Sequence, residues 1–182
     1  FDADVSGWSD LSSGSGSISH DAAVGMLRLN ASGGSNPAAA GQAIVTGEAD
    51  GEHVLRFRIS GAPGDTVAFR LGTTAGGTEI RADVQYGTGW HSVAFVPGTS
   101  TFYIAFRNTM SKTVRLDDVA LIDGDAVEIG TPYTTDNLPA LKFAQSADTM
   151  WICSENHPVH KLTRSGHESW SLTEALFHDG PW

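Results

Sequence analysis

Two adjacent acidic residues, Asp117 and Asp118, stand in an otherwise apolar stretch about two thirds of the way along the chain. Carboxylates in apolar surroundings are costly unless they are paired, hydrogen-bonded or bound to a metal ion. In one interpretation, one of the two side chains points to solvent and the other forms a hydrogen bond with a loop. In the other, they bind Ca²⁺, a hard cation that takes carboxylate and carbonyl oxygens. Asp2 or Asp4 near the N-terminus would then supply a further ligand.

Four aromatic residues are candidates for contact with a sugar: Trp8, Tyr86, Trp90 and Tyr103. A sugar site needs an exposed aromatic plane beside a few polar groups that fix the ligand. Tyr103 alternates with its phenylalanine neighbours, so it should face away from the core, and Trp90 follows a glycine turn. Taken alone, each of the four fits a packing role better than ligand contact, and the sequence does not show that they converge.

Two other groups of side chains fit chemistry less well. Cys153, His157 and His160 have spacings that zinc could use, but no fourth ligand follows at a structural spacing, with His167 as the one candidate. The three acids Glu48, Asp50 and Glu52 could mimic a glycosidase carboxylate pair, yet they surround a glycine and predict a solvated hairpin turn. The chain has no nucleophile elbow and no phosphate-binding loop motif. We therefore expect no enzymatic activity.

The elements that must position these residues are β-strands. Residues 53–60 alternate apolar and polar side chains with a period of two, and the pattern recurs along the first two thirds of the chain. Turn signals rich in Gly and Pro separate the strands at intervals of about 8–14 residues, which is typical of sandwiches and barrels. The expected strands are 24–31, 41–48, 53–60, 67–71, 78–86, 90–96, 102–107 and 113–122. This pattern predicts an antiparallel β-sandwich of jelly-roll type.

The last of these strands carries an irregularity at the acidic pair. Val114 and Leu116 share one parity, whereas Val119 and Leu121 share the other. A β-bulge between the two pairs would turn both inward. Two stretches of small residues, 12–19 and 31–40, predict surface loops, and the first could also contact a ligand.

Composition excludes several classes of protein. The 182 residues carry 11 Lys and Arg against 21 Asp and Glu, a net charge of −10. This balance argues against binding to nucleic acid, which needs clustered cations. No window is apolar over the roughly 18 residues that a membrane span needs. A single cysteine, Cys153, excludes an internal disulfide framework.

The chain divides into two parts of different composition. Residues 1–127 hold 18 of the 21 glycines, whereas residues 128–182 hold four of the seven histidines and three of the five tryptophans. Turn residues at 124–132 mark the join, so we expect a sandwich domain at 1–124 and a C-terminal β segment at 125–182. The second part predicts a meander of short strands at 149–153, 159–163 and 170–172. Such a meander rarely stands alone, so it should pack on the sandwich, on another chain, or on further sequence of a truncated second domain.

The first part resembles the carbohydrate-binding jelly-roll modules. The resemblance rests on Phe1-Asp2, on Gly7-Trp8, on the glycine-rich strands, and on Leu116-Asp117-Asp118-Val119-Ala120-Leu121. In such modules an acid of the first strand and an acid of the last strand commonly hold a structural Ca²⁺ ion. The resemblance therefore implies a calcium site made by Asp2 with Asp117 or Asp118.

The second part resembles a segment that recurs in bacteriophage tail and other virion proteins. The motifs that carry this resemblance follow one another in the same order: Thr131-Pro132-Tyr133, Leu138, Phe143-Ala144-Gln145-Ser146-Ala147-Asp148, His157-Pro158, Leu162, Arg164, Trp170, Leu172 and Asp179-Gly180-Pro181. The resemblance implies a structural part of a virion and no enzymatic activity.

Together these features predict a non-enzymatic, tail-associated phage virion protein whose sandwich binds a carbohydrate or the host surface. The C-terminal segment, rich in Trp and His, would serve as an interface with other tail subunits, with the chain as a homo-oligomer, because aromatic residues concentrate in interface cores. The alternative is a carbohydrate-binding module of a bacterial secreted, glycan-active enzyme, whose catalytic domain would lie elsewhere in the parent chain.

Overall fold

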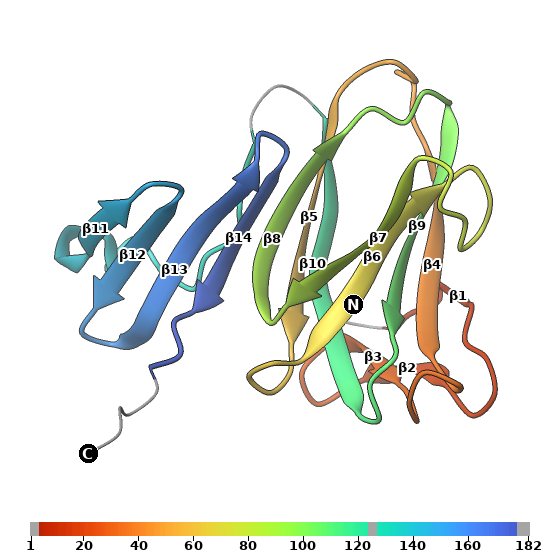
Figure 1. Cartoon of the computed structure of the whole chain (residues 1–182), viewed down its shortest axis with the longest axis horizontal. Helices are drawn as coiled ribbons and strands as arrows, with labels where there is room; N and C mark the ends of the chain where they lie inside the picture. The colour runs from red at the N-terminus through yellow and green to blue at the C-terminus, as the bar shows by residue number, and fades with distance from the viewer. Residues whose placement is uncertain (1–3, 124–126, 178–182) are drawn as a thin grey trace.

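The computed structural model describes residues 4–123 and 127–177 and confirms the predicted all-β, jelly-roll fold. Two antiparallel sheets face each other (Figure 1). The five-stranded sheet has the order β1 (Ser9–Asp10), β4 (Ala38–Val45), β9 (Thr101–Asn108), β6 (Thr66–Gly72) and β7 (Arg81–Gly87). None of the described residues forms a helix that is long and apolar enough to cross a membrane.

The second sheet has nine strands, and only part of it belongs to the sandwich. The strands that face the first sheet are β8 (Gly89–Phe95), β5 (His53–Ser60), β10 (Thr113–Asp123), β3 (Met26–Asn30) and β2 (Ser17–Asp21). Four more strands continue this sheet beyond β8, in the order β14 (Ser169–Glu174), β13 (His157–Gly166), β12 (Thr149–Ser154) and β11 (Lys142–Ser146). They extend sideways from the sandwich in Figure 1.

The core of the sandwich is built from aromatic rings of both sheets. Phe57 of β5 lies 5.5 Å from Phe69 of β6 and 5.0 Å from Phe106 of β9, measured between ring centroids. All three side chains are almost fully buried. The alternation that predicted these strands therefore places one phenylalanine of the larger sheet against two of the smaller.

The predicted β-bulge in β10 is confirmed. Asp117 pairs with Arg58, and the next pair joins Ala120 to Arg56, so one residue of β10 is left over. Asp118 adopts a φ of 50°, in the left-handed region. The bulge lets the apolar residues on both sides of the acidic pair pack on the core, as their parity requires.

Two predicted loops are partly strands. Residues 17–21 form β2, because Ile18 packs against the core and the strand pairs with β3. Residues 38–40 belong to β4, and Ala38 and Ala40 are fully buried. Small side chains here reflect close packing and not a mobile surface. The acids Glu48, Asp50 and Glu52 are exposed as predicted, but their turn joins strands of different sheets and is no hairpin.

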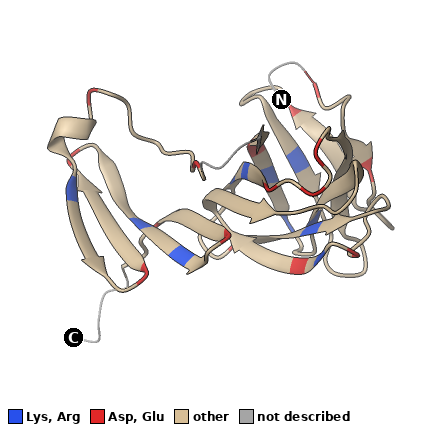
Figure 2. Cartoon of the chain, turned by 90° about the horizontal axis from the view of Figure 1, so that it is seen from above, with Lys and Arg blue, Asp and Glu red and all other residues tan. Residues whose placement is uncertain are grey.

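The C-terminal segment contains one strand more than predicted. β11 escaped the sequence pattern because all five of its residues are exposed, which removes the alternation. β14 pairs with β8 over Ser169↔Val93 to Leu172↔Trp90. Of the three expected supports for this segment, the structure therefore shows the sandwich, through the pairing of β14 with its strand β8. Residues 127–141, which include the 3₁₀ helix η1 (Leu138–Ala140), pass over the four strands in Figure 2.

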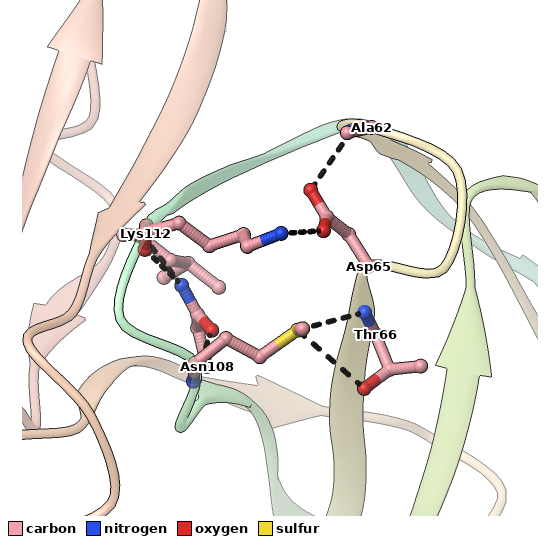
Figure 3. A network of polar contacts seen from close by, with 7 residues as sticks. Ala62, Asp65, Thr66, Asn108 and Lys112 are labelled. Atoms are coloured by element: carbon pink, nitrogen blue, oxygen red, sulfur yellow. Dashed lines mark hydrogen bonds and ion pairs between the residues drawn. The ribbon is translucent and has the colours of Figure 1, made fainter.

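A polar network around the buried Asp65 fixes two turns at one end of the sandwich. The Lys112 ammonium lies 2.5 Å from Asp65 Oδ1, and the Ala62 amide donates to Asp65 Oδ2 at 2.8 Å. Asn108 donates to the Lys112 carbonyl at 2.8 Å (Figure 3). Burial alone would raise the pKa of Asp65, but the bonds from Lys112 and Ala62 hold it below its usual value.

Replacing Lys112 with glutamine is expected to lower the free energy of unfolding by about 1–3 kcal/mol, because the buried Asp65 carboxylate loses its cation. Arg164→Gln is the matched control, since the ion pair of Arg164 with Asp148 is exposed and should contribute less than about 1 kcal/mol. Urea unfolding of both variants measures the difference. Equal losses would show that the Asp65 network does not stabilise the turns.

Candidate functional site

The structure distributes the four predicted sugar-contacting aromatic residues over separate places. Trp8 is partly buried and lies 6.0 Å from Phe106 between ring centroids, so one side of its ring belongs to the core. It also lines a hollow of about 360 Å³ together with both members of the acidic pair, Asp117 and Asp118. The Trp8 ring therefore packs on the core with one side and borders the hollow with another.

The prediction that Tyr86 offers a face to a ligand is contradicted by its burial. The side chain is only 5% exposed, and its ring meets Phe57 edge-on at 5.3 Å. The Tyr86 hydroxyl lies 3.4 Å from Ser169 Oγ of β14. Because β7 pairs with β6, Tyr86 stands opposite the buried Val67 and points into the sandwich.

Trp90 lies at the junction between the sandwich and the C-terminal segment. The Arg58 guanidinium sits over its ring, 4.9 Å from the centroid, and His160 lies 6.0 Å away. Gly130 passes so close that a Cβ there would lie 2.4 Å from Trp90 Cδ1. The ring is thus held on several sides, and its remaining edge lines a large cleft.

Tyr103 faces outward from β9, as its alternation predicted. It belongs to the outer side of the five-stranded sheet, whereas the neighbouring Phe102 and Ile104 are fully buried in the core. Its cross-strand partners are Ala43 of β4 and Gly72 of β6. The tyrosine therefore stands between small residues, with no bulky neighbour directly opposite on either strand.

A groove lies on this outer side of the five-stranded sheet. It measures about 340 Å³, and we name it the sheet-face groove. Its lining residues come from the sheet and from two loops: Leu11, Ser12, Ala39, Arg70, Ala75, Gly76, Ala105 and Arg107. The floor is made of alanines that face away from the core, Ala39 and Ala105. Tyr103 lies two residues before Ala105 on the same face of β9.

The two arginines of the groove differ in their partners. Arg70 is held by Asp83 through two bonds of 2.6 and 2.7 Å and donates to the Gly76 carbonyl at 3.0 Å. Arg107 has no hydrogen-bond or carboxylate partner within residues 4–123 and 127–177. Its five N–H donors therefore remain for a ligand. The sequence reasoning did not single out Arg107, although its parity with Tyr103 was a visible signal.

The acidic pair does not gather into a metal site in the described part of the chain. Asp117 is half-buried, Asp118 is exposed, and Asp4 lines the same hollow. The Asp4 carboxylate accepts bonds from the Ser6 amide at 2.9 Å and from Ser6 Oγ at 2.8 Å, which lower its pKa. No three metal-ligating side chains converge among the residues described, and Asp2 lies outside them. Calcium binding stays a prediction.

Comparisons with known proteins give a limited result. No family model matches the chain, and no curated protein matches it. Among solved structures, a CBM4 is 20% identical with a TM-score of 0.48, over 65% of this chain and 96% of the other. The enzymatically active domain of tailspike protein 4 of bacteriophage CBA120 is 14% identical with a TM-score of 0.46. This match covers 64% of the chain and 19% of the tailspike domain. Likenesses of this strength carry no conclusion about function.

Proposed function

We propose that this chain is a non-enzymatic virion component, associated with a phage tail, whose sandwich binds a carbohydrate of the host surface in the sheet-face groove. The observation that carries the carbohydrate part is the outer side of β9, where the unpartnered Arg107 lines the groove and Tyr103 lies next to the groove between Ala43 and Gly72. The virion part rests on the resemblance of residues 131–181 to segments of tail proteins.

The groove has the chemistry that a sugar requires. A sugar ring presents apolar C–H faces and polar hydroxyls, so it fits an aromatic ring beside donors and acceptors. Tyr103 does not line the groove but lies beside it on the same face of β9, where it would supply the ring; the guanidinium of Arg107, which lines the groove, would supply donors. Arg70 already bonds Asp83 and the Gly76 carbonyl, so it holds the loop that carries Gly76 against the sheet. The Arg70 side chain would therefore lose little further conformational entropy when a ligand binds.

Tyr103→Ala and Arg107→Gln are each expected to weaken the binding of a glycan by about tenfold, because each removes roughly one well-made contact. A glycan array selects the ligand, and isothermal titration then compares the variants. Lys142→Gln is the control, since it removes the same charge from the exposed edge strand β11. No array signal for the wild-type chain would refute the carbohydrate part of the proposal.

The virion part has its own test. Cryo-electron microscopy of the phage particle is expected to show copies of the chain in the tail, related by symmetry, with aromatic residues of the C-terminal segment between chains. Placement outside any particle would overturn this part. If a glycan binds nevertheless, the chain would be the binding module of a secreted glycan-active enzyme.

Calcium at Asp117 and Asp118 is tested by thermal unfolding. If the ion binds the folded state, millimolar CaCl₂ should raise the melting temperature relative to EDTA, because a ligand that binds only the native protein stabilises it. Asp117→Asn should reduce this difference, whereas Asp136→Asn, an exposed acid in residues 127–141, should leave it unchanged. Equal melting temperatures with and without the ion would refute the site.

A further inference from the structure

The sheet-face groove contains a half-buried cation that has no anionic partner within the chain. Arg107 lines the groove, yet it makes no hydrogen bond or ion pair with any residue in 4–123 and 127–177. Removing part of a guanidinium from water is costly unless an anion compensates for it. In a chain with a net charge of −10, this unpaired arginine points to an anion that comes from outside the chain.

The strand register places both arginines of the groove on one face of the sheet. Arg107 of β9 stands opposite Ala68 of β6, and two residues along, Ala105 stands opposite Arg70. The arginines are therefore diagonal cross-strand neighbours, with backbones about 7–8 Å apart. On its other side Arg107 stands opposite Ala39 of β4. Because both of its direct neighbours are alanines, no bulky side chain on β4 or β6 blocks the Arg107 guanidinium.

The charges around the groove leave Arg107 uncompensated. None of the described residues that line the groove is acidic. Asp83 lies next to the groove, but both of its oxygens bond Arg70. Asp10 precedes one wall, and its two oxygens accept bonds from backbone amides of its own loop at 2.9 and 3.4 Å. An anion in the groove would therefore meet the charge of Arg107 without a competing carboxylate.

The walls of the groove are held in place before any ligand arrives. On one side, Ser12 Oγ accepts a bond from the Ala39 amide at 3.0 Å, and the Leu11 amide donates to the Ala39 carbonyl at 2.8 Å. On the other side, Arg70 donates to the Gly76 carbonyl at 3.0 Å. Walls that are already fixed reduce the entropy lost on binding. The Leu11 side chain and the alanine floor add an apolar surface for the C–H side of a sugar ring.

We propose that the sheet-face groove selects a sugar that carries a negative charge, as a carboxylate or a sulfate ester, and that Arg107 binds this group through two N–H bonds. This inference rests on the proposed function, which names the ligand a carbohydrate and the groove its site, and it adds the charge of the ligand. The volume of about 340 Å³ lies at the lower end of the range of small-molecule sites, which suits one charged ring of a glycan.

The test is a nuclear magnetic resonance titration of the whole chain with three methyl glycosides that differ in one group: the β-D-glucuronide, the 6-sulfate of the β-D-glucoside, and the β-D-glucoside itself. The amide signals of Ser12 and Gly76 report on the two walls of the groove. At least one anionic sugar is expected to bind about tenfold more tightly than the neutral glucoside, and the tighter of the two identifies the group. Added NaCl should reduce this preference.

Three variants separate the role of Arg107 from a general effect of charge. Arg107→Gln should weaken the binding of the anionic sugar about tenfold and leave the binding of the neutral glucoside nearly unchanged. Arg107→Lys keeps the charge but loses the planar pair of donors, so it should keep only part of the preference. Arg81→Gln is the control, because it removes an arginine from β7 that does not line the groove. Unchanged amide signals of β5 verify the fold of each variant.

Equal affinities for the three sugars, or an equal loss for all three in Arg107→Gln, would overturn the inference and leave the groove as a site for neutral sugars. The absence of any response to both anionic sugars would overturn it as well. The proposed function fails by a different result, namely array binding that neither Tyr103→Ala nor Arg107→Gln weakens.

Discussion

Replacing Gly89 with alanine is expected to loosen the C-terminal segment from the sandwich without unfolding the sandwich itself. Gly89 has a φ of +135°, which side-chain-bearing residues rarely adopt. A Cβ at this position would lie 2.4 Å from the Leu172 carbonyl oxygen, which belongs to the backbone of β14. The backbone conformation alone costs a non-glycine residue about 1–3 kcal/mol, and the close contact adds to it.

Hydrogen exchange measures this loosening strand by strand. A cost of about 1–3 kcal/mol on the pairing of β14 with β8 speeds exchange of the β14 amides by about 5- to 150-fold. Amides of β5 and β10, which the sandwich buries, should keep their rates. Gly34→Ala is the control, because Gly34 has open space around its position and no left-handed φ. Unchanged exchange of the β14 amides in Gly89→Ala would contradict the prediction, because it would mean that the added Cβ is accommodated with little loss of free energy.

The sequence pattern predicted local features of the fold well. The bulge of β10 followed from the change of parity between Leu116 and Val119, because an apolar side chain on the wrong face is costly. The outward position of Tyr103 followed from alternation along β9 in the same way. Both predictions depend only on residues within one strand.

Features that depend on distant partners could not be predicted in this way. The burial of Tyr86 depends on Phe57, which comes from the opposite sheet, and strand β7 has too few apolar residues to reveal its inner face. The pairing of Trp90 with Leu172 joins residues about 80 positions apart. The contact between the rings of Trp90 and His160 exists only because of that pairing, so no spacing in the sequence could have predicted it.

Acidification from pH 7 to pH 4 is expected to destabilise the same pairing of β8 with β14, because His91 of β8 takes up a proton. This side chain is 1% exposed and lies 5.2 Å from Phe57 and 5.0 Å from Tyr86, measured between ring centroids. Burial lowers its pKa from 6.5 to about 4, although the bond from Nε2 to the Gly87 carbonyl works in the opposite direction. Because Nε2 donates to Gly87, Nδ1 of the neutral ring accepts the Ser171 hydroxyl at 2.9 Å.

The sign of the effect follows from the two protonation equilibria. The unfolded chain takes up a proton at His91 near pH 6.5, whereas the folded protein resists it until about pH 4. The stability that the neutral ring contributes is therefore complete above pH 6.5 and is lost as the pH falls through about 4. The gap between the two pKa values corresponds to about 3 kcal/mol. Asp21, whose bonds to Arg28 and Arg115 lower its pKa to about 2, loses its contribution only at a lower pH.

His91→Gln separates this effect from general acid denaturation. A glutamine amide can donate to the Gly87 carbonyl and accept from Ser171, but it does not titrate, so the free energy of unfolding should change less between pH 6.5 and pH 4. The control is His167→Gln, which removes an exposed histidine from the turn between β13 and β14 and should leave the wild-type slope unchanged. Urea unfolding at half-unit steps of pH gives the slopes. Identical slopes of the free energy of unfolding against pH for the wild type and His91→Gln would show that His91 does not cause the loss of stability in acid. A flatter slope in His91→Gln would assign this loss to the pairing of β8 with β14, which holds the C-terminal segment.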